Sequence, residues 1–113
     1  MTVEAMPAGP GQEIGDPSMM ATQARAASDM MKALAHEGRL MILCHLVEGE
    51  KSVSELEELI GARQAAVSQQ LARLRLEGLV SSRREGKAIY YSIGDPRVRR
   101  IIAILHGIFC ARP

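Results

Sequence analysis

The spacing of apolar residues in the middle of the chain predicts a helix that buries one face. Val67, Leu71 and Leu74 recur at positions i, i+4 and i+7, which is the spacing of one buried helix stripe. Gly78 follows these residues and is typical of a helix end, so the helix is predicted over residues 64–77.

A shorter helix is predicted just before it, over residues 55–60. Ser54, followed three residues later by Glu57, has the pattern of a capping box at a helix start. Gly61 comes directly after the last apolar residue, where a left-handed residue often ends a helix. Residues 61–63 would then form the turn of a helix-turn-helix, a motif that places its second helix in the major groove of DNA.

The polar face of the second predicted helix carries small or hydrogen-bonding side chains, which a major groove can admit and which can pair with base edges. The residues of this helix predicted to meet DNA are Gln64, Ala65, Ser68, Gln69 and Arg73. An ordinary amphipathic helix with a solvated polar face has the same pattern, so this stretch alone leaves both interpretations open.

A β-hairpin is predicted after the second helix. Residues 79–84 and 87–93 are separated by Glu85 and Gly86, a turn signal, and the sequence AIYYSI has the β-branched and aromatic content of a strand. A hairpin beside a helix-turn-helix is the pattern of a winged helix. Basic residues near the tip would present cations to phosphates that flank the groove, and they are Arg83, Arg84 and Lys87.

Three more helices are predicted around this unit, which makes five. They are residues 18–34 with Ser18 as the cap, residues 36–47, and a last helix from Asp95-Pro96 to about residue 109. An aspartate cap followed by proline is a preferred helix start. The predicted face of residues 36–47 is Leu40, Leu43 and Val47, with Met41 and Cys44 beside it.

The last predicted helix has more apolar surface than one core-facing stripe requires. Its apolar residues are Val98, Ile101, Ile102, Ile104, Leu105, Ile108 and Phe109. Part of this surface must be buried against something else, and a second copy of the chain is the simplest partner. The Met- and Ala-rich helix at 18–34 would join this dimer interface.

Length and composition fit one small domain, because 113 residues with 47% apolar residues but only three aromatic residues supply a modest core. Residues 1–17, rich in Gly and Pro, are predicted to form a disordered tail, and residues 18–113 the DNA-binding and dimerisation domain. The chain has no pattern of a signal peptide or a membrane-spanning segment. We therefore expect a cytoplasmic protein without a membrane partner.

The small net charge of +1 conceals a marked asymmetry along the chain. Residues 63–100 contain nine Lys and Arg against three acidic residues, a net charge of +6. The rest of the chain has five basic residues against ten acidic ones, a net charge of −5. The basic half coincides with the predicted reading helix and hairpin, which favours a polyanionic partner such as double-stranded DNA.

These segments together resemble the ArsR/SmtB family of bacterial winged-helix repressors, over about residues 24–110. The stretches that carry the resemblance are ALAHEGRLMIL (33–43), SVSELEELI (52–60), QAAVSQQLARLRLEGLV (64–80) and REGKAIYYSI (84–93). The family implies homodimeric repressors, paired through the terminal helices, that release their operator when a metal or a reactive species is sensed. Two-fold pairing of the reading helices predicts an inverted-repeat operator.

The two cysteines, Cys44 and Cys110, are the candidate sensing residues. Redox or metal chemistry and inert packing as a small apolar residue are both open from their number alone. The family's metal-binding motifs are absent, since serines stand where thiolates would lie in Ser52-Val53-Ser54, and Asp95 and His106 lack the further ligands of a last-helix site. No metal site or other cofactor is therefore expected, and His36, His45 and His106 are interpreted as surface or helix-end residues.

One cysteine in the second helix and one near the end of the last helix resemble the persulfide-sensing SqrR/BigR-like branch of the family. This resemblance implies that sulfane sulfur joins Cys44 and Cys110 through a polysulfide or disulfide bridge and that operator affinity then falls. A gap between the two sulfur atoms, too wide for a direct disulfide, would explain a preference for persulfides over peroxide.

Other functions remain open. Within the regulator class the alternatives are a sensor of oxidants through a simple disulfide, a sensor of arsenic(III), and a haem-responsive protein. A thiol redox protein or enzyme is disfavoured, because the sequence has no Cys-x-x-Cys, phosphate-binding loop or nucleophile elbow. A winged helix that binds only protein is disfavoured by the basic segment.

Overall fold

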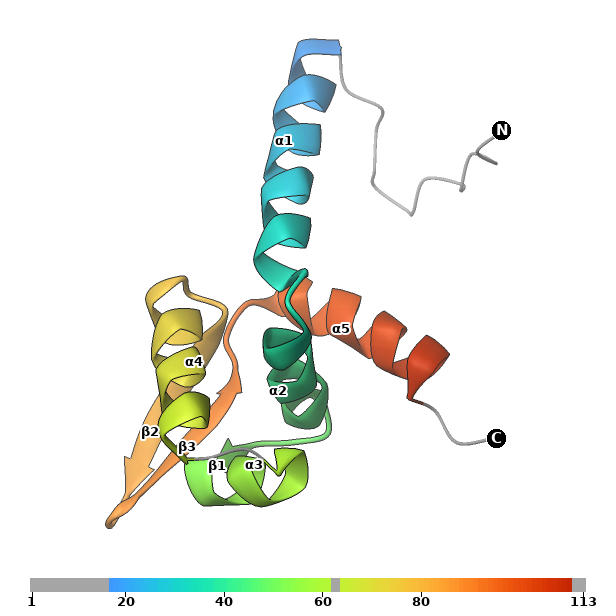
Figure 1. Cartoon of the computed structure of the whole chain (residues 1–113). Helices are drawn as coiled ribbons and strands as arrows, with labels where there is room; N and C mark the ends of the chain where they lie inside the picture. Colours follow the sequence, from blue (N-terminus) through green and yellow to red (C-terminus); the bar gives the residue numbers. More distant parts are fainter. Residues whose placement is uncertain (1–16, 62–63, 111–113) are drawn as a thin grey trace. The chain divides into compact units, whose positions relative to one another are not determined.

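The computed structural model describes residues 17–61 and 64–110 and contains the expected winged helix (Figure 1). In chain order the elements are α1 (Pro17–Leu34), α2 (Glu37–Val47), β1 (Lys51–Ser52), α3 (Val53–Ile60), α4 (Gln64–Leu76), β2 (Val80–Glu85), β3 (Ala88–Ile93) and α5 (Pro96–Phe109). The chain divides after Leu34 into two units, of which the first holds α1 and the second holds all the other elements. The expected tail at residues 1–16 and the turn residues 62–63 lie outside the described residues, and a single domain at 18–113 stays a prediction.

α1 is a helix of 18 residues with a methionine-rich surface. It begins at Pro17, and Ser18 is already helical, so the prediction that Ser18 caps this helix was wrong. Proline is favoured in a first turn because that turn does not need its missing N–H group. Three methionines of α1 are 53%, 55% and 67% exposed, and they are Met19, Met20 and Met31.

α2 lies at the centre of the second unit and contacts α3, α4, α5 and β3. Its buried apolar residues are Ile42, Leu43 and Leu46, whereas Leu40 and Val47 are only partly buried. The predicted face was therefore wrong in two of its three positions. Apolar residues surround most of this helix, so its own pattern could not select the face that packs, and the neighbouring elements decided it.

α3 and α4 form the helix-turn-helix, and the cap of α3 differs from the prediction. Ser52, not Ser54, is the N-cap: its Oγ accepts a hydrogen bond from the Glu55 N–H (3.2 Å), and the Glu55 carboxylate accepts one from the Ser52 N–H (3.0 Å). Both serines have a glutamate three residues later, but Ser52 is held in an extended conformation because it pairs with Tyr90 of β3. That pairing starts the helix two residues earlier than predicted.

The predicted helix ends are confirmed at both glycines. Gly61 ends α3 with a left-handed backbone (φ 73°), and its N–H donates to the Glu57 carbonyl at 2.8 Å. Gly78 follows α4 with φ 76°, and the Leu79 N–H donates back to the Leu74 carbonyl at 2.9 Å. A residue without a Cβ adopts these conformations without strain.

The predicted hairpin of β2 and β3 is joined by a third strand, β1, to form an antiparallel sheet in the order β1-β3-β2. The hairpin register runs from Val80 opposite Ile93 to Glu85 opposite Ala88, so the two-residue turn is Gly86 and Lys87 and not the predicted Glu85 and Gly86, because Glu85 still pairs within the sheet. β1 has only two residues, too few to show the alternating pattern from which a strand is predicted.

Candidate nucleic-acid interface and thiol site

α4 separates a buried face from an exposed polar face, as predicted. Val67, Leu71 and Leu74 are at most 2% exposed. The predicted DNA-binding residues Ser68, Gln69 and Arg73 are exposed, and Gln64 and Ala65 lie in the first turn of the helix. The apolar stripe therefore fixes which side of α4 faces outward, and that side carries hydrogen-bonding groups.

A buried arginine connects α4 to the central helix. Arg39 of α2 is 7% exposed, and its Nη1 donates to the Glu77 carboxylate at 2.7 Å, just past the end of α4. A charge removed from water requires such a partner. This ion pair was not predicted, because the two residues are far apart in the sequence.

The wing presents three basic residues in two different environments. Arg84 on β2 and Lys87 in the turn are exposed, and within residues 17–61 and 64–110 neither forms an ion pair. Arg83 binds Glu50 and Glu85, and its guanidinium lies 4.9 Å from the centre of the Tyr90 ring. The hydrogen bonds to Glu50 and Glu85 raise the pKa of Arg83, and the hydrogen bond from Arg83 holds the pKa of Glu50 below its ordinary value.

The fold brings the two cysteines together. Cys44 on α2 is half-buried, Cys110 directly follows α5 and is exposed, and α2 packs on α5. The pKa of the Cys44 thiol is raised above its ordinary value, first by burial, then by the neighbouring Cys110 and last by the charge of Glu48. Both thiols line the same cavity between α2 and α5, and a gap between their sulfur atoms too wide for a direct disulfide stays a prediction.

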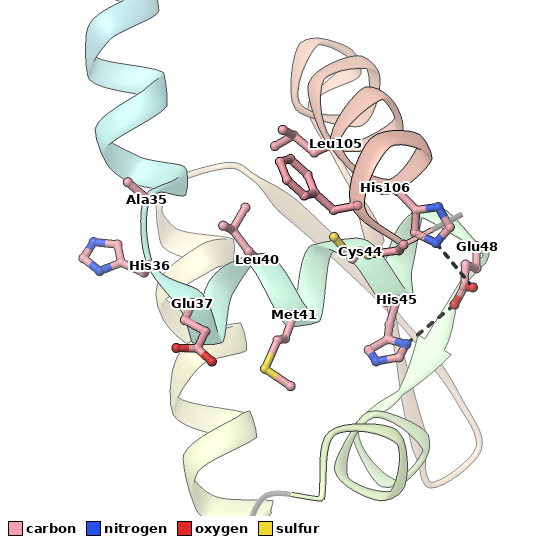
Figure 2. A pocket seen from close by; sticks show the side chains of 12 residues that line it. Ala35, His36, Glu37, Leu40, Met41, Cys44, His45, Glu48, Leu105 and His106 are labelled. Carbon is pink, nitrogen blue, oxygen red and sulfur yellow. Dashed lines mark ion pairs between the residues drawn. The ribbon is translucent and has the colours of Figure 1, made fainter. Parts of the chain in front are cut away.

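A largely apolar cavity of about 780 Å³ adjoins the thiols between α2 and α5 (Figure 2). Its residues are Ala35, His36, Glu37, Leu40, Met41, Cys44, His45, Glu48, Leu105, His106, Phe109 and Cys110. His45 Nδ1 and His106 Nε2 lie 3.6 Å and 3.5 Å from the two carboxylate oxygens of Glu48. Glu48 therefore connects the two helices beside the thiols, a role that was not predicted from the sequence.

Neither a metal centre nor a membrane span is found where the structure is described. Among those residues, no three or more His, Cys, Asp and Glu side chains are grouped so that they could hold a metal ion. In the same part of the chain, no helix is long and apolar enough to cross a bilayer.

The chain is similar to bacterial transcription regulators over most of its length. Residues 36–82 match the family described as "Bacterial regulatory protein, arsR family". The "Biofilm growth-associated repressor" of Agrobacterium fabrum is 44% identical over 101 residues, which cover 88% of this chain and 86% of that protein.

Two solved structures show the same fold. The transcriptional repressor BigR from Xylella fastidiosa has a TM-score of 0.76 and 42% identity, and the match covers 82% of this chain and 92% of BigR. The transcriptional regulator HlyU from Vibrio vulnificus has a TM-score of 0.80 and 40% identity, and the match covers 82% and 97% of the two chains.

Proposed function

Because this chain belongs to the ArsR family of bacterial regulatory proteins, we propose that it is a homodimeric repressor that releases its operator when sulfane sulfur bridges Cys44 and Cys110. Its membership makes it a DNA-binding transcription regulator and not an enzyme. The observation that carries the sensing proposal is that Cys44 of α2 and Cys110 at the end of α5 line the same cavity. A regulator of this kind would act in the cytoplasm, where the chromosome is.

The DNA interface proposed here combines base reading by α4 with phosphate contacts at the wing. The exposed side chains of Ser68 and Gln69 have the hydrogen-bonding groups that pair with base edges. Gln64 and Ala65 share the N-terminal half of α4, the part of a recognition helix that commonly enters the groove. The basic residues of this interface are Arg73, Arg83, Arg84 and Lys87.

A two-fold dimer is supported by apolar side chains left exposed on the terminal helices, each considered by itself. On α5, Ile104, Ile108 and Phe109 are 63%, 67% and 78% exposed, and α1 exposes three methionines. Exposed apolar surface of this kind favours association with a second copy. An isologous pair would present two α4 helices to an inverted-repeat operator.

The proposed sulfur chemistry needs no metal and no further oxidant. Only a thiolate attacks sulfur, and the exposed Cys110 is the more accessible of the two residues, whereas the raised pKa of Cys44 keeps that thiol protonated. The Cys110 thiolate attacks the outer sulfur of a persulfide R–S–SH, which expels the thiolate R–S⁻ and leaves Cys110–S–SH. Cys44 then gives its proton to the expelled R–S⁻, and its thiolate attacks the inner sulfur, which expels HS⁻ and forms a disulfide.

If Cys44 is itself a persulfide, the same displacement leaves a trisulfide. In both cases one sulfane sulfur leaves as sulfide, reduced by two electrons, and the cysteine sulfurs are oxidised. In the trisulfide a second sulfane sulfur stays between the two cysteines. The resulting bridge ties α2 to α5, and a coupling of about 1–3 kcal/mol between sulfur state and DNA would weaken binding roughly 5- to 150-fold.

The test measures the affinity of the reduced protein for its own promoter by fluorescence anisotropy. The measurement is repeated after an inorganic polysulfide is added and again after dithiothreitol, with the intact mass recorded each time. We expect binding to weaken roughly 5- to 150-fold and the mass to match a di-, tri- or longer sulfide bridge, with both changes reversed by the reductant. Cys44→Ser and Cys110→Ser should bind the promoter normally and not respond, and a normal response in either variant would refute the paired mechanism.

A second candidate, a sensor of oxidants through a simple disulfide, is favoured by the position of both thiols at one cavity. Hydrogen peroxide would convert one thiolate into a sulfenic acid with release of hydroxide, and the second thiol would then close a disulfide with release of water. The same assay distinguishes the two functions. Release by peroxide at lower dose than by polysulfide, with loss of only two hydrogens, would favour the oxidant sensor.

A further inference from the structure

We propose that Arg83 is a positioning residue that fixes the wing relative to the start of α3, while Arg84 and Lys87 supply the phosphate contacts of the wing. This inference rests on the proposed DNA interface and assigns a separate role to one of its predicted residues. It concerns only the reduced, DNA-binding protein, so it can fail while the sulfur switch stands, and the converse also holds.

The Arg83 guanidinium is already bound on two of its edges. Nε and Nη2 donate to the two oxygens of the Glu50 carboxylate at 2.8 Å and 2.6 Å, and Nη1 donates to Glu85 at 2.9 Å. The two parallel bonds to Glu50 form a fork that fixes the direction of the side chain as well as its distance. Arg83 therefore has a defined orientation before any DNA arrives.

This fork crosses the sheet. Arg83 on β2 lies opposite Tyr90 on β3, and Tyr90 in turn lies opposite Ser52 on β1. The guanidinium reaches over the Tyr90 ring, 4.9 Å from its centre, to Glu50, which stands directly before β1. One side chain thus links the outer strand of the wing to the segment that leads into the helix-turn-helix.

The far end of this link, Glu50, lies just before the start of α3. Glu50 lies two residues before Ser52, and Ser52 is both a sheet residue and the N-cap of α3. Although the base of the hairpin packs on the helices, within the described residues its pairing with the segment before α3 is limited to the two residues of β1, about which the tip would otherwise bend. The Arg83–Glu50 ion pair adds a second connection, which limits the bending.

The local charge argues against Arg83 as a phosphate ligand. Its single positive charge faces the carboxylates of Glu50 and Glu85, so little positive potential remains for a phosphate. Arg84 is its neighbour on the strand and therefore points to the other face of the hairpin. Arg84 and Lys87 are exposed and, where the structure is described, have no acidic partner.

The first test is Glu50→Gln, because the two roles of Arg83 predict effects of opposite sign. If Arg83 positions the wing, loss of the carboxylate loosens the fork, and affinity for the promoter duplex should fall by roughly two- to fivefold, the scale of an exposed ion pair. If Arg83 binds phosphate, the variant loses a negative charge and frees the guanidinium, so affinity should rise. Unchanged or increased affinity in fluorescence anisotropy would overturn the proposal.

The second test is the salt dependence of binding to a mixed-sequence duplex. The plot of log K against log salt concentration has a negative slope. Arg84→Gln should make this slope shallower by about 0.9 for each phosphate that its side chain no longer neutralises. Arg83→Gln should weaken binding with no change in slope, because the wing still reaches the same phosphates in the complex. A reduced slope for Arg83→Gln equal to that of Arg84→Gln would assign it to phosphate.

Arg83→Lys is the matched variant for charge, since it keeps the cation but cannot form the fork. It should bind DNA as weakly as Arg83→Gln if Arg83 positions the wing, and as strongly as the unmodified protein if it binds phosphate. Thermal unfolding of every variant checks that the fold is intact. If a variant unfolds at the same temperature as the unmodified protein but binds DNA more weakly, the lost affinity comes from the position of the wing and not from loss of the fold.

Discussion

Replacement of Ile108 by glutamine should break the proposed dimer. Ile108 is 67% exposed in the single chain, and Ile104 one turn earlier is 63% exposed. Full burial of an isoleucine side chain contributes about 1.5–3 kcal/mol, so covering the remaining two-thirds contributes about 1–2 kcal/mol. A two-fold interface contains the residue twice, which gives about 2–4 kcal/mol and a rise of roughly 30- to 700-fold in the dissociation constant of the dimer.

Sedimentation equilibrium of the reduced protein over a series of concentrations measures this dissociation constant. The matched control is Leu59→Gln, which changes an apolar side chain that is 52% exposed on α3, outside the terminal helices. The control should leave the dissociation constant unchanged. An unchanged constant for Ile108→Gln, or an equal rise for both variants, would show that α5 does not form the interface and that its exposed face has another use.

Three further predictions concern base reading by α4, the Arg39–Glu77 ion pair just past its end, and the half-buried Cys44 thiol. Gln69→Ala should lower affinity for the operator roughly 5- to 150-fold and affinity for mixed-sequence DNA far less. An equal reduction for both duplexes would show that Gln69 does not read bases. Glu77→Gln should reduce the free energy of unfolding by about 1–2 kcal/mol, because it weakens the ion pair of the buried Arg39. Thermal unfolding at matched protein concentration measures the change, and an unchanged midpoint temperature would contradict the prediction. In the Cys110→Ser variant, the rate at which iodoacetamide alkylates Cys44 is measured against pH, in the folded protein and in urea. The pH midpoint should be higher in the folded protein, because burial raises the pKa of Cys44 and only the thiolate reacts. A lower midpoint in the folded protein would contradict this.

The amino-acid sequence by itself determined the features that depend on residues within a few positions of one another. The buried stripe of α4 followed from a spacing of three and four residues. The ends at Gly61 and Gly78 followed from the backbone freedom of glycine, and the start of α5 from Asp95 beside Pro96. The stretches that resemble a known family supplied the DNA-binding function, which the comparisons with known proteins support.

Only the tertiary structure decided features that depend on distant partners. Ser52 and Ser54 are equal as caps in the sequence, and strand pairing with Tyr90 selected Ser52. Arg83 and Arg84 are equal as surface cations until Glu50 comes to lie beside Arg83. Cys44 and Cys110 come to line one cavity because α2 packs on α5. Local patterns specify which face a residue takes on its own helix or strand, whereas its partner depends on how the elements pack together.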